Sequence, residues 1–431
     1  MAKRHALRPS DISSIVERLQ ELVMAHSGED AFDEIFKMLV AKIFCEVHQL
    51  DSPVFRGAGS SEKLKLEFNR LLAEALKTWP GILDRSYEIK LKAEHLGTCL
   101  DVFNGVNICG ADFEALDHAF EFLVSNASKG AKGQYFTPRH VIECCIRIID
   151  PQPHELIFDP ACGSGGFLFH ALRHIKTSHP EINLPEYAKN KVWGTDFDAK
   201  ATKTAKALLI LAGAPEANIY RVNSLLKPIG QPELGDPLLK QAPLNLEDTL
   251  AALIPRFKGF DIIVTNPPFA GEIAEKETLE GYELAKGNRR TERDVLFIER
   301  CIQLLKPGGR LAIVVPHNKV GALSFAHVRE WLMKKSRVIS VIGLARETFL
   351  PHTHQKTSII VCQKRRDALS KVTNDPILFQ VSTRSGKDAK GKLVTRNPDQ
   401  HLCSHWDRID HDFAEVVESF HQFKTTQNID W

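Results

Sequence analysis

The sequence predicts an α/β protein built on a doubly wound, mostly parallel sheet, with a helical domain at its N-terminus. From Gly130 to Lys364, short apolar runs alternate with longer runs of helical periodicity. Apolar runs of this kind are typical of parallel strands whose two faces are both covered by helices. Before Gly130 the apolar residues recur almost only at helical spacing. A glycine-rich stretch follows the first apolar run, as at the turn that opens a nucleotide-binding strand–turn–helix unit.

The composition is that of a soluble globular protein with more than one core. The chain has 431 residues, of which 43% are hydrophobic and 26% are charged, and a single core rarely grows to this length. No apolar run is long enough to cross a bilayer, and the basic start MAKRHALRPSDISS has no apolar run behind it. A cytoplasmic location is therefore expected. Because the net charge is only +2, any nucleic-acid-binding surface must be local or shared with a partner.

The chain is expected to divide into three regions. They are a helical N-terminal domain over residues 1–128, the α/β domain over residues 129–366 and a polar C-terminal segment over residues 367–431. In the first region, runs of helical period cover Ala31–Val47 and about Glu62–Leu76, after a first helix capped at Ser10 or Asp11. In the last region, the stretch STRSGKDAKGKLVTR predicts a small hairpin or mobile loop, and a short amphipathic helix follows at Phe413–Phe423.

Six apolar runs of the α/β domain are predicted as strands. They are Leu156–Pro160, Lys191–Asp196, Phe260–Asn266, Arg310–Pro316, Val338–Leu344 and Thr357–Gln363. Helices are predicted between them, for example at Ala199–Leu211 and Asp294–Leu305. The last two strands, separated by the short segment ARETFLPHTHQK, are predicted to form an antiparallel hairpin that closes one edge of the sheet.

The sequence predicts no metal site. Its nine cysteines are scattered without a Cys-x-x-Cys spacing, which is the pattern of reduced, mostly buried thiols. His352 and His354 have no third ligand nearby and are interpreted as loop histidines.

The first chemically informative stretch is FDPACGSGGFL, where a strand ends at Asp159 and a helix begins near Phe167. Gly163, Gly165 and Gly166 let the backbone turn sharply and let a ligand approach the main chain. The stretch lacks the Gly-Lys-Ser/Thr ending of a phosphate-binding loop, and it has a leucine where a dinucleotide fingerprint has its third small residue. It therefore favours another nucleotide-like ligand over a nucleoside triphosphate or NAD.

The second stretch is GTDFD, at the end of the next predicted strand. Asp196 is positioned there to accept hydrogen bonds from both ribose hydroxyls of an adenosyl group. An exposed turn aspartate is the alternative for this motif taken alone. The segment Ser178–Asn190 is interpreted as an insertion that lengthens the interval from Asp159.

The third stretch is Asn266-Pro267-Pro268-Phe269, directly after a buried strand. Two prolines hold the backbone extended just past the carboxyl end of the strand, where open α/β sheets bind ligands. The amide oxygen of Asn266 and the carbonyl of Pro267 can then accept hydrogen bonds from one –NH2 group, and Phe269 offers a face on which a planar base can stack. Such a clamp favours the pyramidal nitrogen of a transition state that attacks a methyl sulfonium.

These motifs together resemble the amino-group DNA methyltransferases, which have the class I S-adenosylmethionine-dependent methyltransferase fold. A further stretch, KGQYFTPRHVIECCIRII, resembles the modification (M) subunits of type I restriction-modification systems. The resemblance covers about Gly130 to Lys364 and implies S-adenosylmethionine as the cofactor. It implies cofactor contacts from Gln134, Tyr135, Phe136, Thr137, Pro138, Arg139, Asp159, Gly163, Ser164, Gly165, Gly166, Asp196 and Asn223.

The activity implied by the resemblance is methyl transfer to the N6 amino group of adenine in DNA. The adenine must leave the duplex to reach the site, which costs a few kcal/mol. The implied partners are double-stranded DNA with a flipped adenine, a specificity (S) subunit, a restriction (R) subunit and a second copy of the chain. The segment 367–431 is too short for a base-reading domain, so the choice of sequence is expected to come from the S subunit.

Three alternatives stay open at this point. Asn-Pro-Pro-aromatic sites also methylate glutamine side chains in proteins and amino groups in RNA, because these acceptors are planar –NH2 groups too. Cytosine is a chemically close acceptor, although its enzymes more often carry Ser-Pro-Pro. A catalytically silent scaffold in a defence complex is the alternative from another class.

The polar segment Glu272–Arg293 is interpreted either as a DNA-contacting lid or as a solvated surface loop.

Overall fold

The computed structural model describes most of the chain, in two compact units. The described residues are 9–26, 31–56, 61–84, 86–109, 136–226, 244–246, 250, 253–254, 257–369, 371–396 and 405–431. The helical unit comprises Met1–Ala131 with Lys203–Glu216, and the sheet unit comprises Lys132–Thr202 with Ala217–Trp431. The expected boundary between residues 128 and 129 lies outside the described residues, as do Gln134 and Tyr135. The three-region division stays a proposal.

The helices predicted from apolar spacing in the N-terminal region are confirmed in the helical unit. Its elements are α1 (Pro9–His26), α2 (Ala31–Val47), the 3-10 helix η1 (Pro53–Phe55), α3 (Glu62–Thr78) and α4 (Ala93–Asp101). The helix α2 is buried over most of its length. One charged residue in it, Lys37, is paired with Glu34 at 2.8 Å and with Asp33 at 2.9 Å, as a buried ammonium requires. The Ser61 hydroxyl caps α3 by accepting a hydrogen bond from the Leu64 N–H at 3.2 Å.

The sheet unit is built on nine strands in the order β11-β9-β10-β8-β5-β1-β2-β3-β4. Their bounds are β1 (Ile157–Asp159), β2 (Val192–Asp196), β3 (Asn218–Asn223), β4 (Leu244–Asn245), β5 (Phe260–Thr265), β8 (Leu305–Pro316), β9 (Ser336–Gly343), β10 (Thr357–Lys364) and β11 (Leu378–Val381). All neighbours are parallel except β10, which is antiparallel to β8 and to β9. The six predicted strands and the mostly parallel sheet are confirmed.

The prediction for the last two strands is half right. The strands β9 and β10 do pair antiparallel, but they do not close the edge of the sheet. The strand β10 is inserted between β8 and β9, and β11 pairs in parallel with the other side of β9. The edge is therefore formed by β11, a four-residue strand whose side chains are only partly buried.

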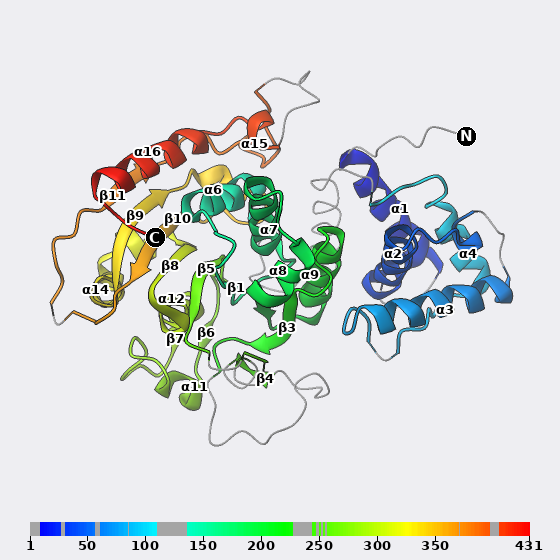
Figure 1. Ribbon diagram of the computed structural model, residues 1–431, viewed down its shortest axis with the longest axis horizontal. Coiled ribbons are helices and arrows are strands. Elements are labelled where there is room, and N and C mark those ends of the chain that lie inside the picture. The colour runs from blue at the N-terminus through cyan, green and yellow to red at the C-terminus, as the bar shows by residue number, and fades with distance from the viewer. Residues whose placement is uncertain are drawn as a thin grey trace. The chain divides into compact units, whose positions relative to one another are not determined.

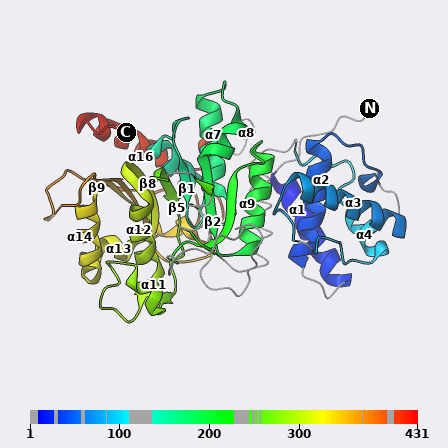
Figure 2. The ribbon, with the colours of Figure 1, turned by 60° about the horizontal axis from the view of Figure 1, so that its bottom comes forward.

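Helices cover both faces of the sheet. The unit contains α6 (Arg139–Ile149), α7 (Gly166–Ser178), α8 (Leu184–Lys191), α9 (Ala199–Leu211), α11 (Lys276–Glu280), α12 (Arg293–Leu304), α13 (His317–Gly321), η2 (Leu323–Phe325), α14 (Ala326–Lys335), η3 (Arg346–Phe349), α15 (His405–Arg408) and α16 (Phe413–Thr426). The part of α9 from Lys203 onward is assigned to the helical unit. Figures 1 and 2 show α6, α7 and α16 on one face of the sheet and α12 and α14 on the other. The doubly wound arrangement is thus confirmed.

Residues 272–293 form ordered structure beside the sheet. The short strands β6 (Glu272–Ile273) and β7 (Thr291–Glu292) pair antiparallel, with α11 between them in sequence. The Tyr282 hydroxyl donates a hydrogen bond to the Leu225 carbonyl at 2.8 Å, which ties this segment to the end of β3. Among the described residues, no helix has the length and apolar character needed to cross a bilayer.

Stacked phenylalanines align the two central strands. Phe158 of β1 and Phe260 of β5 are fully buried, and their rings stack with centroids 4.4 Å apart. Burial of a side chain of this size contributes about 1.5–3 kcal/mol. Every residue of β5 is buried, which explains why its sequence is apolar except at Asp261 and Thr265. The pair holds β1 and β5 side by side, so that the loops after them begin at neighbouring points.

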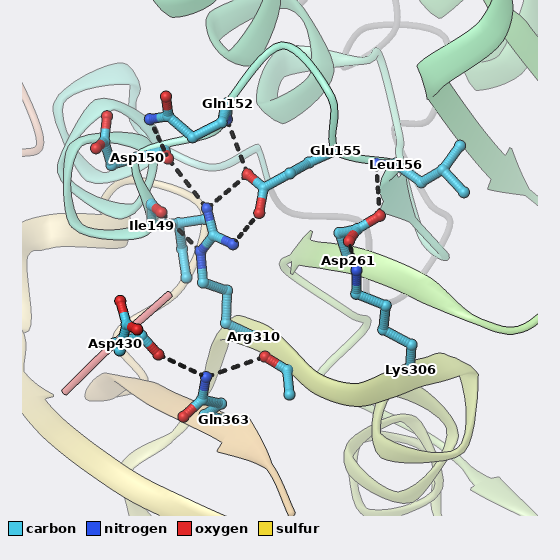
Figure 3. Close-up of polar contacts among 11 residues, drawn as sticks. Ile149, Asp150, Gln152, Glu155, Leu156, Asp261, Lys306, Arg310, Gln363 and Asp430 are labelled. Carbon is cyan, nitrogen blue, oxygen red and sulfur yellow. Dashed lines mark hydrogen bonds and ion pairs between the residues drawn. The ribbon is translucent and has the colours of Figure 1, made fainter. Parts of the chain in front are cut away.

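A buried arginine joins several elements near the start of β1 (Figure 3). Arg310 of β8 donates hydrogen bonds to the carbonyl oxygens of Ile149, at 2.8 Å, and Asp150, at 3.0 Å. Its guanidinium also pairs with both carboxylate oxygens of Glu155, and the two side chains are only 3% and 8% exposed. The end of α6 and the approach to β1 are thereby fixed to β8.

Candidate active site

The candidate residues lie at the carboxyl ends of four adjacent parallel strands. Asp159 ends β1, Asp196 ends β2, Asn223 ends β3, and Asn266 directly follows β5. These strands are neighbours in the order β5-β1-β2-β3, and neighbouring strands lie about 4.8 Å apart. The glycine-rich turn and the Asn-Pro-Pro-Phe loop therefore leave adjacent strands at the edge where open α/β sheets bind ligands.

The glycine-rich turn has a left-handed backbone conformation and open space beside it. Gly163 and Gly165 have φ angles of +54° and +89°, a region that favours glycine. A Cβ atom at Gly163 would meet nothing within 4 Å, whereas one at Gly166 would lie 2.9 Å from the Ile142 side chain. Space for a ligand is thus available at Gly163. Gly166 has a packing role, since it lets α7 approach α6 closely. The neighbouring Ser164 is buried.

Asp196 ties the glycine turn to the second strand. One of its carboxylate oxygens accepts a hydrogen bond from the Gly163 N–H at 2.9 Å, and the other accepts one from the Asp198 N–H at 2.9 Å. Burial raises the pKa of the Asp196 carboxyl, against the opposing effect of these backbone bonds. A carboxylate has about four acceptor positions, so this one retains capacity for a pair of hydroxyl groups.

Asp159 starts the turn in a buried position. Its carboxylate accepts a hydrogen bond from the Ala161 N–H at 3.0 Å. Burial raises the pKa of this carboxyl from its ordinary 3.8 to about 7. The folded chain thus binds the proton more tightly than the unfolded chain, and folding stability must fall as the pH rises between these two values.

We therefore expect Asp159→Asn to remove a pH dependence of stability. The asparagine keeps an oxygen that can accept the Ala161 N–H bond, but it carries no charge to desolvate. The free energy of unfolding of the wild type, relative to the variant, should decline by up to about 1.4 kcal/mol per pH unit as the pH rises from about 4 to about 7. Urea denaturation at pH 5, 6, 7 and 8 measures this difference. Parallel pH profiles for the two proteins would show that Asp159 ionises normally in the folded chain.

The end of the third strand also carries a polar side chain. The Asn223 side-chain oxygen accepts a hydrogen bond from the Leu225 N–H at 3.1 Å, which closes the turn after β3. Its position next to the end of β2 follows from the parallel pairing of these strands.

Thr137 contacts the catalytic candidate directly. The Asn266 side-chain nitrogen donates a hydrogen bond to the Thr137 hydroxyl at 2.8 Å, across 129 positions of sequence. Phe136 and Pro138, on either side of Thr137, are half-buried, and Arg139 is buried at the start of α6. Sequence reasoning connected Thr137 with the cofactor alone. The structure places its hydroxyl against the amide of Asn266.

The amide of Asn266 has a free acceptor. Because its nitrogen donates to Thr137, its oxygen is turned the other way, and that oxygen is buried without a hydrogen-bond partner among the described residues. A buried acceptor left unpaired costs about 1–3 kcal/mol. The next residue, Pro267, is buried as well. The loop thus presents an acceptor that gains free energy when a ligand brings an N–H donor.

Two aromatic rings pack together at the Asn-Pro-Pro-Phe loop. Phe269 is only 8% exposed, and its ring centroid lies 5.8 Å from that of Phe349 at an interplanar angle of 72°. Phe349 ends η3 and was not singled out from the sequence. Phe349 could have been found from the sequence because, with Leu350 and Pro351, it forms a short apolar run inside the otherwise polar segment ARETFLPHTHQK. Edge-to-face packing on Phe349 fixes the orientation of the Phe269 ring.

The strand order and the site at the carboxyl edge define the fold of class I S-adenosylmethionine-dependent methyltransferases. The chain is similar to the crystal structure of a modification subunit of a putative type I restriction enzyme from Vibrio vulnificus, with a TM-score of 0.67 and 17% identity over 98% of this chain and 91% of that one. It is also similar to a putative class I S-adenosylmethionine-dependent methyltransferase from Listeria monocytogenes. That similarity has a TM-score of 0.56 and 15% identity, over 96% of this chain and 98% of that one.

The chain belongs to the N-6 DNA Methylase family, whose model matches residues 111–425. It is 31% identical over 224 residues to the type I restriction enzyme StySPI methylase subunit of Salmonella potsdam. This match covers 51% of the chain and 38% of the relative. The chain therefore spans well under half the length of that relative.

Proposed function

We propose that this chain transfers a methyl group from S-adenosylmethionine to the N6 amino group of adenine in DNA, as the modification subunit of a type I restriction-modification system in the cytoplasm. The observation that carries the proposal is the Asn266 side-chain oxygen, which is buried, oriented and without a partner among the described residues. It lies at the ligand-binding edge of the sheet, three residues before Phe269, whose ring packs on Phe349. The N-6 DNA Methylase family and the type I methylase subunit to which the chain is similar support the same reaction.

The residues at the carboxyl edge fit the proposed cofactor. The open space at Gly163 and the remaining acceptor positions of Asp196 suit an adenosyl group with its ribose hydroxyls. S-adenosylmethionine, when bound, supplies an electrophilic methyl group on a sulfonium. The residues proposed to hold it are Gln134, Tyr135, Phe136, Thr137, Pro138, Arg139, Asp159, Gly163, Ser164, Gly165, Gly166, Asp196 and Asn223.

The catalytic contribution of this chain is orientation of the amine. The Asn266 oxygen and the Pro267 carbonyl accept the two N–H groups, while Pro268 keeps the loop extended and Phe269 holds the plane of the base. The amine lone pair is then free of the ring and aimed away from the clamp. Asn266 cannot take a proton, so the surplus proton passes to water after transfer. The adenine reaches this position by rotating out of the duplex.

The proposed partners follow from the similarity to type I methylase subunits. They are double-stranded DNA, a specificity subunit, a restriction subunit and a second copy of the chain. In this arrangement the specificity subunit reads the DNA sequence, while this chain supplies the transfer site.

A transfer assay with labelled cofactor tests the proposal. The chain, expressed together with its specificity subunit, is incubated with tritiated S-adenosylmethionine and, in parallel, with unmodified plasmid DNA, RNA and a protein mixture. Label recovered from DNA as N6-methyladenine is the expected result. Label in RNA or in protein glutamine, label in DNA as N4-methylcytosine, or no label in any acceptor, would each contradict it.

A further inference from the structure

Residues 384–396 form a basic hairpin with a defined backbone. Its two arms meet through a bridge between Lys387 and Leu393 and a hydrogen bond from the Val394 N–H to the Gly386 carbonyl at 2.9 Å. At the tip, the Asp388 carboxylate accepts the N–H groups of Lys390 and Lys392, both at 2.8 Å. The sequence predicted a small hairpin or a mobile loop here, and the hairpin is confirmed. Its function is not explained by the transfer site alone.

The strand order brings the basic hairpin to the edge of the sheet that carries Asn266. It directly follows β11, which runs parallel to β9. Because β10 is antiparallel to both β9 and β8, β9 runs in the same direction as β8 and β5. The carboxyl ends of β11 and β5 therefore face the same side of the molecule.

Both anchors of the basic hairpin adjoin residues that contact the Asn-Pro-Pro-Phe loop. The Lys387 ammonium donates a hydrogen bond to the Leu350 carbonyl at 2.7 Å, and Leu350 follows Phe349, whose ring packs on Phe269. On the other side, a Cβ atom at Gly386 would lie 3.6 Å from the His140 ring.

His140 in turn stands three residues after Thr137, the hydrogen-bond partner of Asn266. The basic hairpin thus adjoins two segments that contact the Asn-Pro-Pro-Phe loop, one containing Phe349 and the other containing Thr137. It is fixed to Leu350, next to Phe349, and lies near His140 at the start of α6.

Two lysines of the basic hairpin have no ion-pair partner among the described residues. Arg384 pairs with Glu415 at 2.8 Å, and Arg396 lies 3.6 Å from Asp410. Lys390 and Lys392 are exposed, and the salt bridges of the described residues include neither ammonium. The one carboxylate of the hairpin, that of Asp388, is engaged by backbone N–H groups. The basic hairpin therefore carries two exposed positive charges on a folded backbone.

We propose that Lys390 and Lys392 bind backbone phosphates of the DNA duplex beside the flipped adenine. This inference rests on the proposed function, and it adds a DNA-contacting surface to the transfer site. The chemistry fits because an ammonium is a strong point-charge partner for phosphate, and phosphate contacts position a duplex without reading its sequence. Because the hairpin is already folded and anchored, binding orders fewer groups than a free tail would.

The test compares two double variants of equal charge. Lys390→Gln/Lys392→Gln removes the proposed contacts. Lys189→Gln/Lys191→Gln is the control, because these lysines lie at the end of α8, just before the amino end of β2 and on the opposite edge of the sheet. Each protein is expressed together with its specificity subunit, and binding of a fluorescent duplex to the complex is measured with S-adenosylhomocysteine present, at several salt concentrations. Methyl transfer by the wild type is measured on the same duplex.

The hairpin variant is expected to bind about tenfold more weakly at low salt for every DNA sequence, and the slope of log K against log salt should be shallower by about 2, since each phosphate contact contributes about 0.9. The KM for DNA should rise while kcat stays unchanged. Lys390→Arg/Lys392→Arg should restore the affinity, because it keeps both charges. The control should behave as the wild type.

Two results overturn the inference and are distinguishable. If the wild type methylates DNA while the hairpin variant keeps the affinity and salt slope of the control, the hairpin does not contact DNA and only this inference fails. If the wild type methylates no DNA, the proposed function fails, and this inference fails with it.

Discussion

Replacing Asn266 by alanine is expected to lower kcat for methyl transfer by about 10²–10³-fold, the usual effect of removing one fixed polar group that stabilises a transition state. The Asn266 oxygen is the buried acceptor left open by the Thr137 contact. Without it, one N–H of the amine loses its acceptor, and the amine is no longer held in a pyramidal geometry. The affinity for S-adenosylmethionine should change little, because the carboxyl ends of β1 and β2 are intact. Single-turnover transfer and calorimetric titration with the cofactor measure the two effects.

Thr137 supplies a matched comparison. Thr137→Val keeps the shape of the side chain and removes the hydroxyl that holds the Asn266 amide, whereas Thr137→Ser keeps the hydroxyl. We expect the valine variant to lose about tenfold in kcat, as for loss of one hydrogen bond of about 1.4 kcal/mol, and the serine variant to stay near the wild type. If Asn266→Ala instead weakens cofactor binding and leaves kcat intact, Asn266 belongs to the cofactor site and the amine clamp is wrong.

The sequence was most informative where one residue pattern determines one structure. Every residue of β5 is buried, and its apolar residues Phe260 and Ile262–Val264 predicted a strand covered on both faces. The helices Ala31–Val47 and Ala199–Leu211 were predicted with the bounds they have, because their apolar spacing is maintained from end to end. The Asn266 loop and the glycine turn could be placed at one edge because both follow strands of a parallel sheet.

The strands β3 and β11 were not predicted, because their own sequences lack a strand pattern and they form only by pairing with neighbouring strands. In β3 the buried residues Ile219 and Val222 are separated by half-buried and exposed ones, among them Arg221, so the run has neither strict alternation nor an apolar core. The edge strand β11 has exposed residues at every second position, Phe379 and Val381. Each becomes a strand only through parallel pairing with a strand that is already in place.

Contacts between side chains that are far apart in the sequence could not be predicted from local residue patterns. The Thr137–Asn266 hydrogen bond joins positions 129 residues apart, and no local spacing encodes it. Phe349 reaches Phe269 because the segment after β9 folds over the same edge of the sheet. The basic stretch after β11 had the composition of a flexible loop, but the Lys387 bond to Leu350 fixes it in place. Such tertiary contacts decide the detail of the site.

Removing the guanidinium of Arg310 is expected to cost more stability than any other single change considered for the sheet. Arg310→Met leaves the Glu155 carboxylate buried without its partner and leaves the Ile149 and Asp150 carbonyls without a donor. Truncation of one member of a buried pair typically destabilises by about 3–5 kcal/mol. The double change Arg310→Met/Glu155→Gln should recover part of the loss, because no unpaired charge remains buried. Urea denaturation followed by circular dichroism measures the free energy of unfolding of each protein.

A second ion pair in Figure 3 provides the control for this measurement. Lys306 pairs with Asp261 near the same strands, but the lysine side chain is 45% exposed, against 3% for Arg310. The Lys306 ammonium is partly in solvent, and without it the Asp261 carboxylate still accepts a hydrogen bond from the Leu156 N–H at 2.9 Å. Lys306→Met should therefore shift the urea midpoint far less than Arg310→Met. Equal shifts would mean that burial does not distinguish the two pairs, and that Arg310 does not hold β8 to the end of α6. Since Arg310 lies away from Asn266, its variant should keep the wild-type affinity for S-adenosylmethionine at temperatures where it is folded, which separates a loss of stability from a loss of the site.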